Sequence, residues 1–212
     1  MVVIGLGRFG KSLALELMGD GMEVLGIDED PKTVQALAGR LTHVVEADST
    51  NEEALRQLSV HEFGRAVVGV GSDLEASILT SSILVNFGIN NIWAKAITHS
   101  HARILRQLGV HHVVRPEHDM GKRVAHLVRG RMLDYIEFDD GYAIVKTRPP
   151  SSIHGMPLGE SRVRSRYGVT IVGVKRAGED FTHATPDTVV RSRDLIIVSG
   201  PQDRVERFTD LA

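Results

Sequence analysis

The sequence predicts an α/β protein with a doubly wound parallel sheet, followed by a long helix and a small α+β domain. Over the first ~130 of 212 residues, short apolar runs alternate with amphipathic stretches. A glycine-rich segment follows the first apolar run. The regular alternation ends after Met132. Alternating strands and helices are typical of a parallel sheet wrapped by helices on both faces.

The elements of the first domain follow from this periodicity. Apolar, β-branched runs predict six strands, at 2–4, 23–28, 42–46, 65–70, 91–96 and 111–115. Helical spacing predicts helices at 9–18, from Pro31 onward, 51–58, 73–87, 99–108 and 116–130. The first strand is shorter than the usual ~5–6 residues, so we expect that the chain begins at an internal start or is a piece of something longer.

Irregular alternation marks the second domain. Strands are expected at 135–138, 142–147, 168–175 and 194–199, with a loop at 149–152 and a final helix at 201–208. We place the domains at 1–131 and 132–212.

Composition excludes several classes of function. The 25 basic and 27 acidic residues give a net charge of −2, which argues against bulk binding of nucleic acid. There are no cysteines, so disulfides, thiolate metal sites and a cysteine nucleophile are excluded. No apolar run approaches the ~18–20 residues that cross a bilayer, and the N-terminus does not read as a signal peptide.

Residues 5–10, GLGRFG, fit the G-x-G-x-x-G pattern between a strand and a helix. Gly5 is expected to make the tight turn, Gly7 to let backbone approach a pyrophosphate, and Gly10 to bring helix and strand close. The phosphates would lie on the free N–H groups and positive end of that helix.

Asp28 ends the second strand, 18 residues after Gly10. Its carboxylate can accept hydrogen bonds from both ribose hydroxyls and would repel a 2′-phosphate, which favours NAD or another adenosine ribose over NADP. Arg8 lies inside the loop, where a guanidinium suits a terminal phosphate, so ATP or ADP fits as well as NAD. The alternatives are a surface aspartate and a solvated arginine.

Three further segments end strands at the same edge of the sheet. Residues 48–50 follow the third strand and can reach an adenine edge, while Ser49 or Thr50 can cap the next helix. Residues 69–71 either bring backbone close to the ligand or simply turn the chain. Lys95 ends the fifth strand and either snorkels outward or reaches a ligand.

Glu117 begins the long helix. It is either a first-turn acid favoured by the helix dipole or a carboxylate that reaches phosphates through Mg²⁺. The spacings of His99 with His101 and of His111 with His112 do not place two ligands on one helix face, so no histidine metal site is expected.

Several segments together resemble RCK (regulator of potassium conductance) proteins, most closely the cytosolic gating subunits of Ktr/Trk-type potassium uptake systems. They are GLGRFGKSLA (5–14), LGIDED (25–30), EADSTNEEAL (46–55), VVGVGSDLEASILTS (67–81), NIWAKA (91–96), LGVHHVVRPEHDMG (108–121) and SRYGVTIVGVKR (165–176). The similarity covers nearly the whole chain.

The resemblance implies a Rossmann-like domain joined by a crossover helix to an RCK C-terminal domain. It implies dimers, commonly in an octameric ring, under a potassium-conducting membrane protein at the inner face of the plasma membrane. Motif matching puts Arg8 and Glu117 at terminal-phosphate and cation positions, the cation being Mg²⁺ or Ca²⁺. The candidate nucleotide-binding set is Gly5, Gly7, Arg8, Phe9, Gly10, Asp28, Glu29, Asp30, Asp48, Ser49, Thr50, Val70, Gly71, Lys95 and Glu117.

Some relatives bind a cyclic dinucleotide in the C-terminal domain, near positions matching Arg164, Ile171 and Pro186, but the neighbouring residues differ. We expect a non-enzymatic regulator that binds ATP/ADP or NAD(H) and gates potassium transport. The alternatives are a cation-controlled gating domain of a fused channel and an NAD-dependent oxidoreductase. The last lacks a convincing acid/base pair in the second domain.

Overall fold

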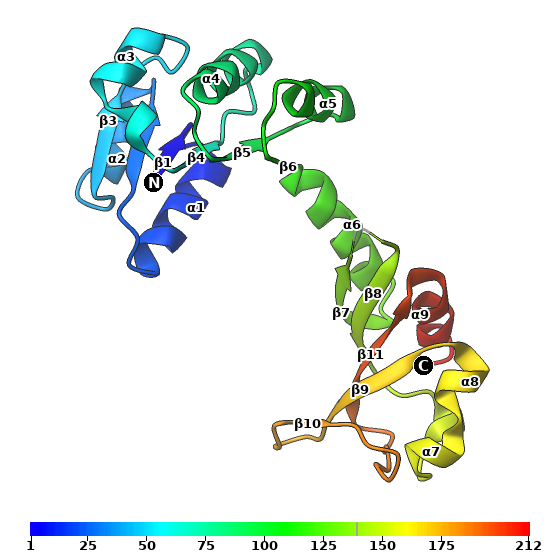
Figure 1. The fold of residues 1–212 in the computed structure, drawn as a ribbon. Helices are drawn as coiled ribbons and strands as arrows, with labels where there is room; N and C mark the ends of the chain where they lie inside the picture. The colour runs from blue at the N-terminus through cyan, green and yellow to red at the C-terminus, as the bar shows by residue number, and fades with distance from the viewer. Residues whose placement is uncertain (139) are drawn as a thin grey trace. The chain divides into compact units, whose positions relative to one another are not determined.

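A computed structural model describes residues 1–138 and 140–212 and divides them into two compact units, Met1–Glu117 and His118–Ala212 (Figure 1). The division falls in the first turn of helix α6 (Pro116–Val128), whereas the sequence placed the boundary at the far end of that helix. The reason is packing: Leu127 joins the core of the second unit, and Arg123 pairs with Asp134 of the same unit.

The first unit contains a parallel sheet in the order β3-β2-β1-β4-β5-β6, which is the strand order of a doubly wound dinucleotide-binding fold. The predicted fold class is therefore confirmed. The strands are β1 (Val2–Ile4), β2 (Leu25–Asp28), β3 (His43–Glu46), β4 (Arg65–Val68), β5 (Asn91–Lys95) and β6 (His112–Val114).

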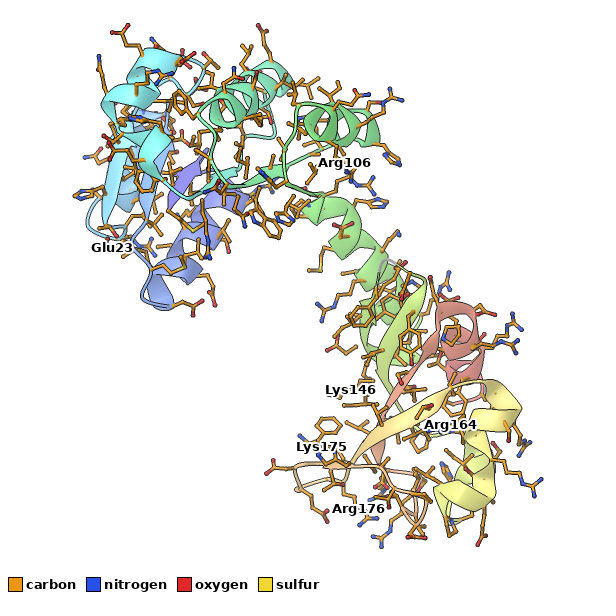
Figure 2. The ribbon with its side chains drawn as sticks, in the orientation of Figure 1. Glu23, Arg106, Lys146, Arg164, Lys175 and Arg176 are labelled. Atoms are coloured by element: carbon orange, nitrogen blue, oxygen red, sulfur yellow. The ribbon has the colours of Figure 1, made fainter. Side chains whose placement is uncertain are left out.

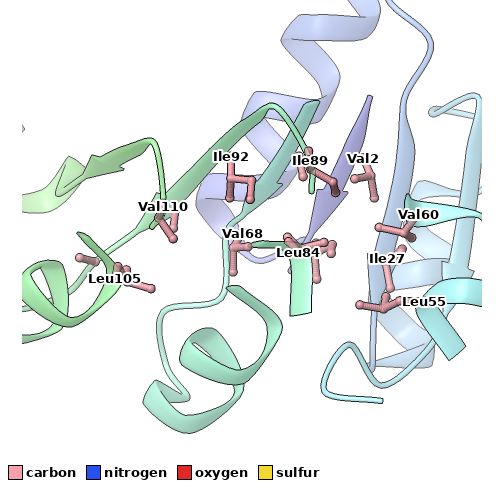
Figure 3. Close-up of a cluster of buried hydrophobic side chains, with 14 of the residues drawn as sticks. Val2, Ile27, Leu55, Val60, Val68, Leu84, Ile89, Ile92, Leu105 and Val110 are labelled. Carbon is pink, nitrogen blue, oxygen red and sulfur yellow. The ribbon is translucent and has the colours of Figure 1, made fainter. Parts of the chain in front are cut away.

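Helices cover both faces of this sheet. They are α1 (Arg8–Gly19), α2 (Pro31–Leu37), α3 (Glu52–Gln57), α4 (Leu74–Asn86) and α5 (His99–Gln107), with a 3-10 turn at Val60–Glu62. On one face, side chains of α3, α4 and α5 pack on Ile27, Val68 and Ile92 of the strands (Figure 3). On the other, Ala14 of α1 and Leu37 of α2 join Val3 in a second cluster. The alternation of Val2 and Val3 between the two clusters follows from the two-residue period of a strand.

Helix α3 shows a difference from the sequence prediction. Ser49 and Thr50 were the expected cap, but Asn51 is the cap, and its side chain accepts from the N–H groups of Glu53 and Ala54. The reason is that Thr50 is held by Asp48 and that Ser49 turns toward Thr80 of α4.

The second unit contains an antiparallel sheet in the order β10-β9-β11-β8-β7 (Figure 1). The strands are β7 (Met132–Glu137), β8 (Tyr142–Thr147), β9 (Thr170–Lys175), β10 (Phe181–His183) and β11 (Leu195–Pro201). The helices are α7 (Leu158–Ser161), α8 (Val163–Tyr167) and α9 (Gln202–Thr209), with a 3-10 turn at Ser151–Ile153. Among the described residues, no helix is both long and apolar enough to span a membrane.

Three of these elements were not predicted. Helices α7 and α8 have four and five residues, too few to show a helical period, and Arg162 separates them with a left-handed φ of 51°. Strand β10 has three exposed residues and therefore lacks an apolar run.

Gly10 provides a direct test of the packing in the first unit. A Cβ at this position would lie 1.9 Å from the carbonyl oxygen of Gly5, which is backbone and has no rotamer to change. We expect Gly10→Ala to lower the free energy of unfolding by about 2 kcal/mol or more, measured by urea unfolding. Gly19→Ala in the same helix meets open space and should be neutral or stabilising. A Gly10→Ala protein as stable as the parent would contradict this packing.

Candidate functional site

A cleft of about 620 Å³ lies at the carboxyl ends of the parallel strands of the first unit. Its walls include the loops after β1 and β4, the two strands between which the sheet order reverses, and ligands of doubly wound sheets bind at this point. Twelve of the fifteen candidate residues line it: Gly5, Gly7, Arg8, Phe9, Asp28, Glu29, Asp48, Ser49, Thr50, Val70, Gly71 and Lys95. Gly10, Asp30 and Glu117 do not.

The glycine loop forms one wall through close backbone packing. Gly5 has a φ of +83°, and a Cβ there would lie 2.7 Å from the Val70 nitrogen. Gly7 has no atom within 4 Å of a would-be Cβ, so its backbone is open to a ligand. It also precedes α1, whose first turn has no side-chain cap. The N–H groups at this helix end are therefore suited to an anion.

Asp28 links the second strand to this loop. Its Oδ2 accepts from the N–H of Leu6 at 2.6 Å, and its Oδ1 accepts from the N–H of Asp30 at 2.9 Å. Both bonds leave acceptor capacity on a carboxylate, which offers about four lone-pair positions. The carboxylate thus holds the glycine loop and lines the cleft at the same time.

Asp30 has a structural role. Its carboxylate accepts from the N–H groups of Lys32 and Thr33 and from the Thr33 hydroxyl, so it caps α2. The Thr33 hydroxyl and these backbone donors lower the pKa of Asp30 below its usual range. Sequence reasoning missed this cap, although an Asp directly before Pro31 at the first helical position is a typical N-cap signal.

The loop after β3 is held by local hydrogen bonds. The Asp48 Oδ1 accepts from the Thr50 hydroxyl at 2.7 Å and from the Thr50 N–H at 2.8 Å, and these bonds lower the pKa of Asp48. Ser49 and Thr80 hydroxyls lie 2.8 Å apart, which joins the loop to α4. The loop therefore presents an ionised carboxylate to the cleft.

Lys95 brings a cationic group to the cleft. Lys95 is largely buried, with its ammonium 5.8 Å from the centre of the Phe9 ring and its Cε 3.2 Å from a would-be Cβ of Gly71. The ammonium donates to Glu117 Oε1 at 2.6 Å. This bond, with smaller help from Arg8, lowers the pKa of Glu117. Glu117 therefore contacts a cleft residue without lining the cleft itself.

The sequence interpretation missed one wall, which comes from the start of α4. Ser72, Asp73, Glu75, Ala76 and Leu79 line the cleft there. A sequence signal existed, because ligands of doubly wound sheets lie beyond the carboxyl ends of the strands, and residues 72–79 come shortly after the end of β4. Among the described residues, no group of three or more His, Asp or Glu side chains could hold a metal ion. His111 instead accepts from the Ile92 N–H through Nδ1.

Arg164, Ile171 and Pro186 lie together in the second unit. They line a separate hollow of about 450 Å³ between α7, α8 and β9.

Strand order, glycine loop and the acidic end of β2 define a Rossmann-type cleft domain followed by a small antiparallel α+β domain. The family description TrkA-N domain matches residues 1–116, and TrkA-C domain matches residues 142–212. The chain belongs to this TrkA-N/TrkA-C family.

Relatives agree over nearly full length. Ktr system potassium uptake protein C of Bacillus subtilis is 37% identical over 207 residues, which are 97% of this chain and 94% of the relative. Ktr system potassium uptake protein A of Vibrio alginolyticus is 34% identical, over 96% of this chain and 93% of the relative. Among solved structures, the GsuK RCK domain has a TM-score of 0.65 at 19% identity and covers 99% of this chain, which spans 46% of that one. This likeness shows the fold.

The Lys95–Glu117 pair predicts a measurable titration. Because the folded-state pKa of Glu117 is lowered, the pair stabilises the folded chain above the ordinary carboxyl pKa, and the stabilisation is lost as pH falls through the lowered value. We expect Lys95→Met to raise the Glu117 pKa toward the ordinary value of a glutamate carboxyl, which carboxyl-carbon NMR would follow. The control is Lys122→Met, which removes a lysine of the same helix that lies beside Glu137, and it should leave the Glu117 pKa unchanged. An unmoved Glu117 pKa in Lys95→Met would show that the pair does not form.

Proposed function

We propose that this chain is a cytosolic regulatory subunit or domain that gates a potassium channel or transporter by binding an adenine nucleotide, ATP/ADP or NAD(H). The observation that carries the proposal is the Asp28 carboxylate, held against the glycine loop and lining a 620 Å³ cleft. Family membership supports the transport role, since the relatives are potassium uptake proteins.

The cleft fits the parts of an adenine nucleotide in order. The Asp28 carboxylate accepts hydrogen bonds from the ribose hydroxyls, and Glu29 beside it adds negative charge that disfavours a 2′-phosphate. Asp48 and Thr50 lie on the adenine side, and Arg8 and Lys95 on the phosphate side. Neighbours in fold include the GsuK channel bound to NAD and a Kef domain bound to AMP, which supports an adenine nucleotide as the class of ligand.

Gating needs only a difference in affinity between two conformations of the protein. A ligand that binds one conformation tenfold more tightly shifts the equilibrium by about 1.4 kcal/mol. In a ring of identical subunits, which we propose as a dimer-based octamer, these shifts add. The same proposal places the chain in the cytoplasm, held at the inner face of the membrane by its potassium-conducting partner.

Glu117 is the proposed cation ligand. A divalent ion such as Mg²⁺ or Ca²⁺ typically takes one or two carboxylates together with phosphate oxygens. The Lys95 bond lowers the pKa of Glu117, and Glu117 lies one hydrogen bond from Lys95, in the part of the cleft to which we assign the phosphates. We propose no catalytic step, because gating requires binding alone.

The first experiment measures thermal unfolding with nucleotide. We expect ADP, ATP or NADH to raise the melting temperature by several degrees at ~100 times the dissociation constant, while NADPH raises it much less. Asp28→Ala should abolish the shift, because the ribose loses its acceptor. Asp20→Ala, at the far end of α1 and outside the cleft, should keep it.

Asp28→Ala also removes the hydrogen bonds to Leu6 and Asp30, so its melting temperature without nucleotide is expected to fall. Calorimetric titration well below that temperature then separates lost binding from lost stability. A folded Asp28→Ala protein that binds ADP as tightly as the parent would refute the site.

Arg8 tests the position of the terminal phosphate. We expect Arg8→Gln to weaken the binding of ATP by about tenfold or more and to change the binding of AMP little. The reason is that we place the Arg8 guanidinium at the phosphates beyond the first. Lys11→Gln, one turn along α1 and outside the cleft, is the matched control. Equal losses for ATP and AMP, measured by calorimetry, would place Arg8 elsewhere.

A further inference from the structure

The sheet of the second unit has one packed face and one bare face. On the packed face, Val163 of α8 and Val205 and Phe208 of α9 join a hydrophobic cluster with Val145 and Val198. The hydrophobic clusters of residues 1–138 and 140–212 include none of the side chains on the opposite face. In an antiparallel sheet with one solvated face, outward positions are expected to be polar.

Several of the outward positions are apolar instead, beside the polar Asp134 and Lys146. Strand pairing places Ile136 beside Ile144, and Ile197 beside Lys146, on this face. Tyr142 lies two residues before Ile144 and therefore points the same way. Half of Ile136 is exposed, at 51%, and Tyr142 is exposed at 39%. Contiguous exposed aliphatic and aromatic side chains of this kind are typical of interaction surfaces.

Two lysines, Lys146 of β8 and Lys175 of β9, lie on the same face of this sheet (Figure 2). The Lys146 and Lys175 ammonium groups are 5.9 and 5.4 Å from the centre of the Phe181 ring, which is 41% exposed. Gly173 of β9 pairs with Ile197 of β11 on one side and His183 of β10 on the other, so β9 has no side chain at this position.

Among the described residues, no carboxylate forms an ion pair with either lysine. Asp134 lies opposite Lys146 in register, but its carboxylate accepts from Arg123 at 2.6 Å, and this bond lowers the Asp134 pKa more than Lys146 does. The face therefore carries Ile136, Ile144 and Tyr142 on β7 and β8, and cationic side chains from Lys146 of β8 and Lys175 of β9.

We propose that this face, defined by Ile136, Tyr142, Ile144, Lys146, Lys175, Phe181 and Ile197, docks an acidic amphipathic helix of another protein. The apolar stripe of the helix, at i, i+3, i+4 and i+7, covers the isoleucines and Tyr142. Asp or Glu residues along one flank of that stripe pair with the two lysines. A helix about 10 Å in diameter covers two strands spaced ~4.8 Å apart, here β7 and β8 with Ile136, Ile144 and Tyr142.

Charge decides between this occupant and a second copy of the chain. Two copies packed face to face through this surface would bring four unpaired lysines into one interface, whereas an acidic helix neutralises them. The proposal does not depend on the nucleotide cleft, which lies in the other unit.

A photo-cross-linking experiment tests the proposal in the intact chain. Phe181 is replaced by benzoylphenylalanine, the protein is expressed in its own cells, and the cross-linked peptide is identified by mass spectrometry. We expect a segment of a different protein with helical apolar spacing and an acidic flank. Benzoylphenylalanine in place of Leu211, exposed at the end of the chain, should not give this product.

The matched variant is the double substitution K146E/K175E, which keeps the apolar stripe and reverses the charge. We expect this variant to reduce the yield of the cross-link about tenfold or more. It should weaken the binding of a synthetic peptide of the identified segment by the same factor, and the melting temperature of the protein should not change. Cross-links to a second copy, to the chain itself or to lipid would overturn the proposal. Absence of any product, or a product insensitive to K146E/K175E in a folded protein, would also overturn it.

Discussion

The hydrogen bond from the Leu6 N–H to the Asp28 carboxylate is the constraint on which the site depends. It joins the turn after β1 to the end of β2, and it fixes the carboxylate where the cleft begins. The carboxylate accepts from two backbone donors, the N–H groups of Leu6 and Asp30. The same interaction thus shapes the glycine loop and sets the position of the acceptor that a ribose would meet.

Close backbone packing among three glycines supports this arrangement. A Cβ on Gly69 would lie 2.6 Å from the Gly5 oxygen, and Gly10 meets the same oxygen from the helix side. The three glycines let β1, β4 and α1 converge on one point, which is where the strand order reverses. Lys95 at the end of β5 lines the same cleft and donates to Glu117 in the first turn of α6, the helix that continues into the second unit. The cleft is therefore in direct contact with the element that leads out of its unit.

The sequence predicted the parallel sheet, its helices and most cleft residues, because β-branched runs, Pro31 and the glycine spacing each have a local cause. It did not separate residues that share a local pattern but differ in tertiary partner. Asp28 and Asp30 are acids two residues apart where β2 ends and α2 begins, yet only Asp28 lines the cleft. In the same way, Asn51 rather than Ser49 caps α3, because the Ser49 hydroxyl contacts Thr80. Helices α7 and α8 were missed because four or five residues carry no period.

The most direct measurement of the central claim is a crystal structure of the chain grown with ADP. The account predicts ribose hydroxyls within hydrogen-bond distance of the Asp28 carboxylate and phosphates over the N–H groups that follow Gly7. A nucleotide bound elsewhere, or a cleft in which Asp28 contacts only Leu6 and Asp30 at saturating ADP, would contradict it.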